Sequence, residues 1–224
     1  MKTIKKLLVL ASFVIAGTLF VVHFYLYENP GTAEDLAEIK QVFNDFKQAL
    51  TDESGSRAVD LVDQATLERI KKLQLLALEA TKEELDAEPL AHQFYVMMLR
   101  MNLSPRALAV MSPREVGVYL LGNRILGNFF EDRSHIDRIE VRGRYASARH
   151  MKLKWQVGDP LAFVRESDHW RFRLLPMIDE VNGQMQTLAD KTGNDAQELM
   201  YRIIEFISMK RIKKDHFLPV KGEL

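Results

Sequence analysis

The chain has 224 residues, 47% of them hydrophobic, so it is long enough for one well-filled domain plus an appendage. The 31 basic side chains balance 31 acidic ones, and this zero formal charge gives no global field of the kind that favours nucleic acid. Cysteine is absent, which excludes disulfides, thiol catalysis, thiolate metal sites and the lipid attachment of a bacterial lipoprotein.

The amino terminus combines a basic start with a long uncharged segment. MKTIKK precedes a stretch from Leu7 to Tyr27 without a charged side chain. About 20 such residues span the hydrocarbon core of a bilayer. A secretory signal cleaved near Ala16 is the alternative, but the apolar run continues through TLFVVHFYLY. We therefore expect a transmembrane anchor over 1–28 in a bacterial inner membrane, with the N-terminus in the cytoplasm and the globular part in the periplasm.

Helical patterns follow the anchor. Thr32 and Asp35 form a capping-box pattern before a helix that extends to about Leu50, and TDESGS breaks it. Helical periodicity resumes over 57–85, with an interruption near Asp63, and again after Pro89 in LAHQFYVMMLRMNL.

The last of these helices has the strongest start signal. Ser112 as N-cap, Pro113 in the first turn and Glu115 three residues after the cap predict a helix that continues to about Phe130.

The pattern then changes to strands. IDRIEVRG, YASARHMKLKWQV, LAFVRE and WRFRLL alternate polar and apolar residues and are separated by tight corners, which predicts an antiparallel meander. In the second strand we expect the odd positions from Tyr145 to Val157 to face the core, with His150 on the wet face. His169 is also expected on a wet face.

Two helices are predicted after the sheet. Pro176 ends the last strand, a helix stops at Gly193, and Asn194 or Asp195 starts a final helix that runs through KRIKK, residues 210–214. Leu199, Ile203, Phe206 and Ile207 share one face of it. The basic KRIKK segment suits the helix dipole, and contact with anionic lipid headgroups is the alternative.

These elements predict an α+β fold: an N-terminal transmembrane helix, a helical layer packed on a curved antiparallel four-stranded meander, and C-terminal helices. The expected domains are the anchor over 1–28, an α+β domain over 29–180 and a helical extension over 181–224.

Charge is unevenly distributed along the chain. Residues 28–100 carry 15 acidic and 8 basic side chains, whereas residues 133–173 carry 10 basic and 5 acidic ones. The basic strands supply the candidate partner surface: Arg138, Arg142, Arg144, Arg171 and Arg173. Basic residues on strands also discourage edge-to-edge pairing, so that role stays open.

The chain resembles the nuclear-transport-factor-two-like superfamily of cone-shaped α+β domains. The resemblance rests on the opening QVFNDFKQAL, the tract RYASARHMKLKW and the residues Phe163, Val164, Glu166, Asp168, Trp170, Phe172 and Leu174. The resemblance covers about residues 33–180. The tract WRFRLLPMIDEVNGQMQTL is also loosely similar to periplasmic phospholipid-carrier proteins. The superfamily resemblance implies a sheet around an apolar cavity that its members use for catalysis, ligand carriage or dimerisation.

Aromatic and methionine side chains are the candidates for lining such a cavity, although their spacing equally suits an ordinary core. The ligand-pocket candidates are Met97, Met98, Tyr119, Tyr145, Trp155, Trp170 and Phe172. We predict no catalytic residue, no metal site and no cofactor, because the common hydrolase, metalloprotease and nucleotide motifs are missing and His135 with Asp137 is best interpreted as a surface pair.

Three functional hypotheses follow. The leading one is a membrane-anchored extracytoplasmic binding or assembly module without catalytic activity, which contacts a protein partner or a second copy through the sheet. The second is carriage of an apolar ligand such as a lipid in the cone cavity. The third is an acid/base enzyme that uses that cavity, and a fold of this kind does not choose between them.

Overall fold

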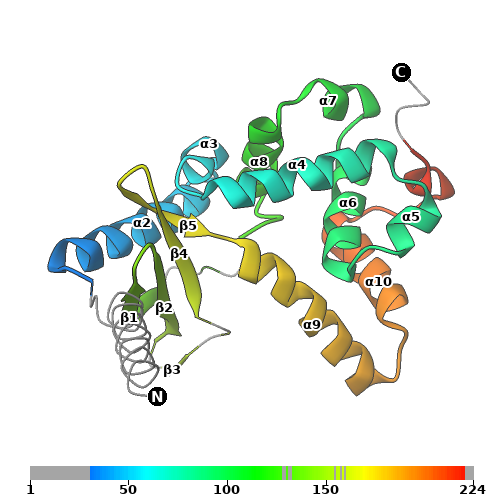
Figure 1. Cartoon of the computed structure of the whole chain (residues 1–224). Coiled ribbons are helices and arrows are strands. Elements are labelled where there is room, and N and C mark those ends of the chain that lie inside the picture. The colour runs from blue at the N-terminus through cyan, green and yellow to red at the C-terminus, as the bar shows by residue number, and fades with distance from the viewer. Residues whose placement is uncertain are drawn as a thin grey trace, which may run out of the picture.

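The computed structural model describes residues 31–219 except 128, 129, 131, 132, 154, 157 and 159. It confirms an α+β arrangement in which helices pack against an antiparallel sheet (Figure 1). The anchor expected over 1–28 lies outside the described residues. In the part of the chain that is described, no helix has the length and apolar character needed to cross a membrane.

Seven helices precede the sheet in the described part of the chain, and several of them begin at cap signals of the sequence. Thr32 and Asp35 form the predicted capping box. Asp63 is the N-cap of the helix that begins at Gln64, and Ser112 forms a capping box with Glu115. The helices are α2 (Ala33–Thr51), α3 (Gly55–Val59), α4 (Gln64–Glu79), α5 (Lys82–Asp86), α6 (Leu90–Asn102), α7 (Pro105–Val110) and α8 (Pro113–Gly122).

The expected length of α8 is wrong, because the helix stops at Gly122 rather than near Phe130. The backbone N–H and side-chain Nδ2 of Asn123 both donate to the carbonyl of Tyr119, at 3.0 and 2.8 Å. Arg124 then adopts a positive φ of 53°. These local hydrogen bonds satisfy the last turn and send the chain away from the helix axis.

The sheet is an antiparallel meander with one added short strand. Its order is β1-β2-β4-β5, and β3 pairs with β2. Ser167 and Asp168, with φ of 48° and 67°, make the predicted tight turn between the last two strands. The strands are β1 (Ser134–Arg142), β2 (Tyr145–Lys152), β3 (Trp155–Gln156), β4 (Leu161–Glu166) and β5 (His169–Arg173).

The tract YASARHMKLKWQV is therefore two strands rather than the single one expected. Leu153 has a φ of 57°, and the chain turns there so that β3 folds back onto β2. Leu153 is 55% exposed in this turn.

The face assignment of β2 is also wrong. Ala146, Ala148 and His150 are buried, whereas Tyr145 is 50% exposed. Alanine carries little hydrophobic signal in a sequence, so Tyr145 dominated the apparent pattern. The inner face nevertheless needs small residues, because the large rings of α2 approach it.

Aromatic rings fill the space between α2 and the sheet. Phe46 lies 4.8 Å from Phe172, and Phe172 lies 5.0 Å from Phe163, measured between ring centroids. Phe43 and Phe46 each meet Phe130 edge-on at 5.7 and 5.8 Å. Such edge-to-face contacts stabilise a core beyond the area that they bury.

The first turn of α2 holds the β4–β5 hairpin. Asp35, 6% exposed, accepts a hydrogen bond from Trp170 Nε1 at 2.9 Å and forms an ion pair with Arg165. Glu38 accepts from the backbone N–H of Trp170 at 3.0 Å. Burial alone would raise the pKa of Asp35, but the hydrogen bonds from Trp170 and Thr32 and the charge of Arg165 lower it.

Two helices and a 3₁₀ turn follow the sheet: α9 (Leu175–Thr192), α10 (Ala196–Ser208) and η1 (Lys214–Phe217). Gly193 ends α9 in a left-handed conformation and Asp195 caps α10, as predicted. The last strand ends at Arg173, and Pro176 lies in the first turn of α9 rather than stopping the strand. The domain boundary expected at 180 falls within α9, and the division into domains stays a prediction.

The final helix is shorter than expected, because it ends at Ser208 and not within KRIKK. Met209 adopts a left-handed φ of 54°, and the Ser208 hydroxyl donates to the carbonyl of Ile204 at 2.7 Å. Glu205 then accepts from the backbone N–H of Ile212 at 2.8 Å. The chain therefore folds back on the last turn of the helix and ends it, although the residue pattern of the segment does not indicate this.

Candidate interaction surface

The outer face of the sheet, opposite α2, is built by residues that share a register across the strands. One row runs Arg142, Tyr145, Val164, Arg171 from β1 to β5. The next row runs Glu140, Ser147, Ala162, Arg173. Strand side chains alternate between faces, so both rows lie on the face that the core does not use.

Arginine dominates this outer face. Arg142, Arg149, Arg171 and Arg173 lie on this face. Arg138 at the bulge of β1 and Arg144 at the tip of the β1–β2 hairpin border it. All five predicted partner-surface arginines are therefore brought to one side of the sheet. Their role as a partner surface stays a prediction.

Acidic residues partly offset these arginines. Asp63 lies 3.9 Å from Arg173, Glu166 occupies an outer position of β4, and two more acidic residues lie on β1. Asp137 pairs with Arg149, with an Nε–Oδ1 distance of 2.8 Å, and Glu140 lies 3.4 Å from Arg142 and 3.7 Å from Arg138. The hydrogen bond from Arg149 lowers the pKa of Asp137, and Asp137 raises the pKa of Arg149, so this pair is fully charged at neutral pH. Positive charge nevertheless stays in excess on the described outer face.

The centre of the first row is apolar and partly closed. Val164 is only 1% exposed, although it lies between Tyr145 and Arg171 on the outer face. The guanidinium of Arg144 stacks over the Tyr145 ring, 5.5 Å from its centroid. Arg171 donates to the backbone carbonyl of Asp60 at 2.6 Å, which fixes one end of the row. The row thus presents a fixed aromatic and guanidinium surface.

The ligand-pocket candidates do not gather around a common space. Met97, Met98, Trp170 and Phe172 are at most 2% exposed and belong to the same packed core. Tyr119 is half-buried, and burial raises the pKa of its hydroxyl. Tyr145 lies on the outer face. The backbone of Trp155 belongs to β3, and its side chain is outside the described part.

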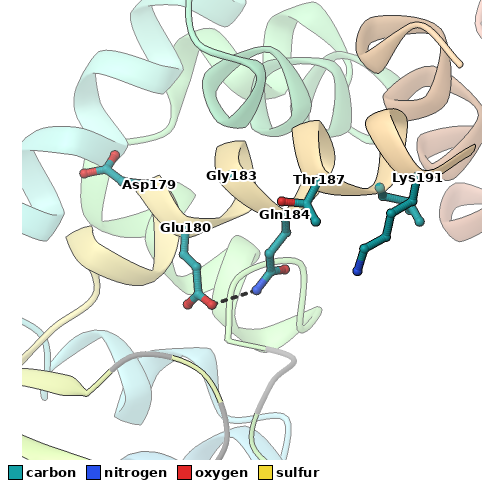
Figure 2. A pocket seen from close by; sticks show the side chains of 7 residues that line it. Asp179, Glu180, Gly183, Gln184, Thr187 and Lys191 are labelled. Carbon is teal, nitrogen blue, oxygen red and sulfur yellow. Dashed lines mark hydrogen bonds between the residues drawn. The ribbon is translucent and has the colours of Figure 1, made fainter. Parts of the chain in front are cut away.

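Two open hollows of the surface are lined by other residues. The first, of about 550 Å³, follows α9, where Glu180, Gln184 and Lys191 project into it (Figure 2). A hydrogen bond of 2.9 Å joins Gln184 to Glu180 in this hollow. The second lies between α4 and α5, beside Leu75 and Glu88. Neither contains a predicted pocket residue.

A partly buried polar cluster at the start of α6 was not anticipated. His92 Nδ1 lies 2.6 Å from Glu88, and Arg69 donates to His92 Nε2 at 2.9 Å and to Asp179 at 2.8 Å. A guanidinium can only donate, so His92 Nε2 accepts and Nδ1 carries the proton. The histidine therefore has no free lone pair for a substrate proton, and the cluster serves to join α4, α6 and α9.

The remaining histidines divide between core and surface. His150, expected on the wet face, is 4% exposed and lies 5.4 Å from the Phe130 ring. His169 is on the surface, as expected, 3.2 Å from Glu38. His135 and Asp137 share the outer face of β1 before the bulge that follows Asp137. No group of three or more potential metal ligands occurs among the residues that the structure describes.

Comparison with known proteins does not assign a function to this surface. No family model, no curated protein and no solved structure matches the chain. The likeness to the nuclear-transport-factor-two-like superfamily therefore stays a prediction from the sequence.

Proposed function

We propose that this chain is a membrane-anchored extracytoplasmic binding module without catalytic activity, which holds an acidic segment of a protein partner on the outer face of its sheet. The observation that carries the proposal is the row Arg142, Tyr145, Val164, Arg171, in which two arginines flank an exposed tyrosine and a buried valine. Tyrosine and arginine are the residue types that dominate binding energy at protein interfaces.

Charge supports an acidic partner. The described outer face carries six arginines against Asp137, Glu140 and Glu166, with Arg173 also 3.9 Å from Asp63. The side chains of Arg138 and Arg142 are 71% and 66% exposed. Guanidinium groups bind carboxylates through paired hydrogen bonds, which gives both orientation and specificity. Complementary charge also accelerates the encounter of two proteins.

The inner side of the sheet favours binding over carriage or catalysis. Trp170 and Phe172 are buried at 1% and 0% exposure, and the Phe172 ring contacts three other phenylalanines. A carried lipid would have to displace these packed rings. An acid/base site would need space for a substrate beside a titratable group, and His150, 4% exposed, lies against the Phe43 and Phe130 rings instead.

Photo-crosslinking in the full chain tests the proposal. p-Benzoylphenylalanine replaces Ser147 at the centre of the outer face, or Val110 on α7, which is 77% exposed, as the control position. We expect a discrete cross-linked partner from position 147 only. Peptide mapping should place the cross-link in a segment rich in Asp and Glu, and the purified partner should bind the purified full chain.

Charge reversal provides the matched control. Arg142→Glu with Arg144→Glu should lower the affinity for that partner at least tenfold and weaken its salt dependence, whereas Arg106→Glu with Arg202→Glu, elsewhere on the surface, should not. Equal affinity for the two double variants would overturn the proposal. A cross-link from position 147 to a second copy of this chain would replace the acidic partner with self-assembly.

A further inference from the structure

Helix α10 carries more apolar surface than its neighbours cover. Met200 and Ile204 are completely buried against the rest of the molecule. In contrast, Phe206 is 79% exposed, Ile207 is 49% exposed and Met209, directly after the helix, is 87% exposed. An isolated exposed apolar residue needs no explanation, but three within four positions do.

Phe206 belongs to an apolar stripe along one side of the helix. Leu199, Ile203 and Phe206 are spaced by four and three residues, so they lie one above the other, next to the buried residues that face the core. Leu199 and Ile203 are half-buried. The apolar arc of α10 is therefore wider than its contact with α6 and α9.

A basic segment is fixed beside this stripe. Lys210 Nζ donates to the Met101 carbonyl at 2.9 Å and to Asn102 at 3.0 Å, which holds the start of the segment against the end of α6. Arg211 is 90% exposed, 3.8 Å from Glu205. Lys213 and Lys214 follow in sequence and are exposed, and Asp215 is the next acidic residue. Positive charge is therefore in excess from 210 to 214.

We propose that the exposed stripe of α10 and the basic segment 210–214 dock on the surface of a bilayer that contains anionic lipids. Phenylalanine and methionine side chains gain free energy by entering the boundary between headgroups and acyl chains. Each lysine or arginine near an anionic surface adds to the electrostatic attraction. A protein interface would instead disfavour a lysine-rich border.

The length of the linker supports this occupant. The inference rests on the anchor of the proposed function, for which the uncharged stretch ends at Tyr27, while the described domain begins at Gly31. The three residues between them span at most about 10 Å when fully extended. Such a tether keeps the domain at the bilayer and raises the effective concentration of a second, weaker contact. Figure 1 shows α10 with η1 at the end of the molecule opposite the start of α2, so the domain has to lie along the bilayer for α10 to reach it.

The absence of cysteine allows a clean test. In the full chain, Met209→Cys carries an environment-sensitive fluorophore, and Val110→Cys, another exposed apolar position at 77% against 87%, is the control. Both are reconstituted in nanodiscs of phosphatidylcholine with or without phosphatidylglycerol. With phosphatidylglycerol present, we expect the emission at 209 to shift to the blue and to be quenched by lipids spin-labelled in the acyl chain.

Charge reversal at Lys213→Glu with Lys214→Glu should reduce that quenching several-fold, with circular dichroism unchanged. Equal weak quenching at 209 and 110 in anionic nanodiscs would overturn the inference and leave the outer sheet face untouched. A shift at 209 that disappears on dilution with unlabelled chain would assign the stripe to a second copy and also overturn it. A chain that does not remain with nanodiscs would overturn the anchor and this inference together.

Discussion

His150 Nε2 has no hydrogen-bond partner among the described residues, although the ring is buried. Phe43 and Phe130 surround it, with ring centroids at 6.3 and 5.4 Å. Burial, together with the charge of His135, lowers the pKa of His150 below its ordinary value of 6.5. Protonation of this side chain therefore opposes folding.

His150 therefore makes the folded protein less stable at acid pH. The unfolded chain takes up the proton first, so the free energy of unfolding falls as the pH drops below about 6.5. We expect His150→Leu to flatten this dependence between about pH 7 and 5.5, where most carboxylates stay charged. His169→Leu, at a histidine on the surface, is the control. Urea unfolding of the full chain in a nonionic detergent measures both, and equal slopes for the two variants would contradict the assignment.

Arg100 is a second buried group, in this case with four hydrogen bonds from its guanidinium to the backbone. Its guanidinium donates to the carbonyls of Ala77 at 2.8 Å, Leu76 at 3.0 Å, Ala80 at 2.6 Å and His216 at 3.2 Å. Burial lowers its pKa to about 10, so it stays charged at neutral pH. The positive charge faces the negative end of the α4 dipole.

Removing this guanidinium takes a hydrogen-bond donor away from the carbonyls at the end of α4, those of Ala77 and Ala80 among them. We expect Arg100→Met to lower the free energy of unfolding by about 3 kcal/mol, because buried carbonyls lose their donors. Arg106→Met, at an exposed arginine on α7, should change it by less than about 0.5 kcal/mol. Chemical denaturation of both variants compares them, and a midpoint for Arg100→Met as high as for Arg106→Met would refute the capping role.

At the scale of the element, β2 gives the sharpest contrast between neighbouring positions. Ala148 is fully buried on the inner face, and Ser147 lies on the outer one. We expect Ala148→Glu to destabilise by more than about 3 kcal/mol, because it buries an unpaired carboxylate. Ser147→Glu should cost less than about 1 kcal/mol. Thermal melts of the two variants test this, and the reverse order would restore the face assignment expected from the sequence.

The elements that the sequence predicted well are those that one or two residues fix locally. Thr32 and Ser112 set helix starts, Gly193 ends α9, and Ser167 with Asp168 make a hairpin turn, since each acts on its own backbone. The end of α10 could not be predicted, because it depends on a fold-back of Ile212 onto Glu205 and on the contact of Lys210 with the end of α6.

The candidate surface was only partly predictable for the same reason. The alternation in WRFRLL places Arg171 and Arg173 on one face without further knowledge. The neighbourhood of Arg142 and Tyr145 depends on strand register and on alanines taking the core positions, which alternation alone does not supply. The bulge after Asp137 shifts β1 further from a regular pattern.

At the scale of the whole molecule, one hydrophobic core includes residues of α2, α6, β5 and α10. Helix α9 leads from the sheet to α10 along the helical layer (Figure 1). Asp179 of α9 pairs with Arg69, and Asn182 accepts from the backbone N–H of Leu90 at 3.0 Å. These links predict that sheet and helices unfold together.

Gly183 allows that cooperativity to be tested. It lies in α9 beside the hollow of Figure 2, and a Cβ at this position would meet nothing within 4 Å. Gly183→Ala should therefore stabilise the helix by about 1 kcal/mol and raise the melting temperature by about 3 °C. Gly193→Ala should do the opposite, because φ there is 67°.

Two probes of the same melt decide the question. Tryptophan emission reports the sheet, since Trp155 and Trp170 both belong to strands, and far-ultraviolet circular dichroism reports mainly the helices. If the molecule unfolds as one unit, Gly183→Ala shifts both transitions equally although it changes a single exposed position of α9. A shift seen by circular dichroism but not by tryptophan emission would mean that the sheet unfolds independently, and that α9 connects two separate units.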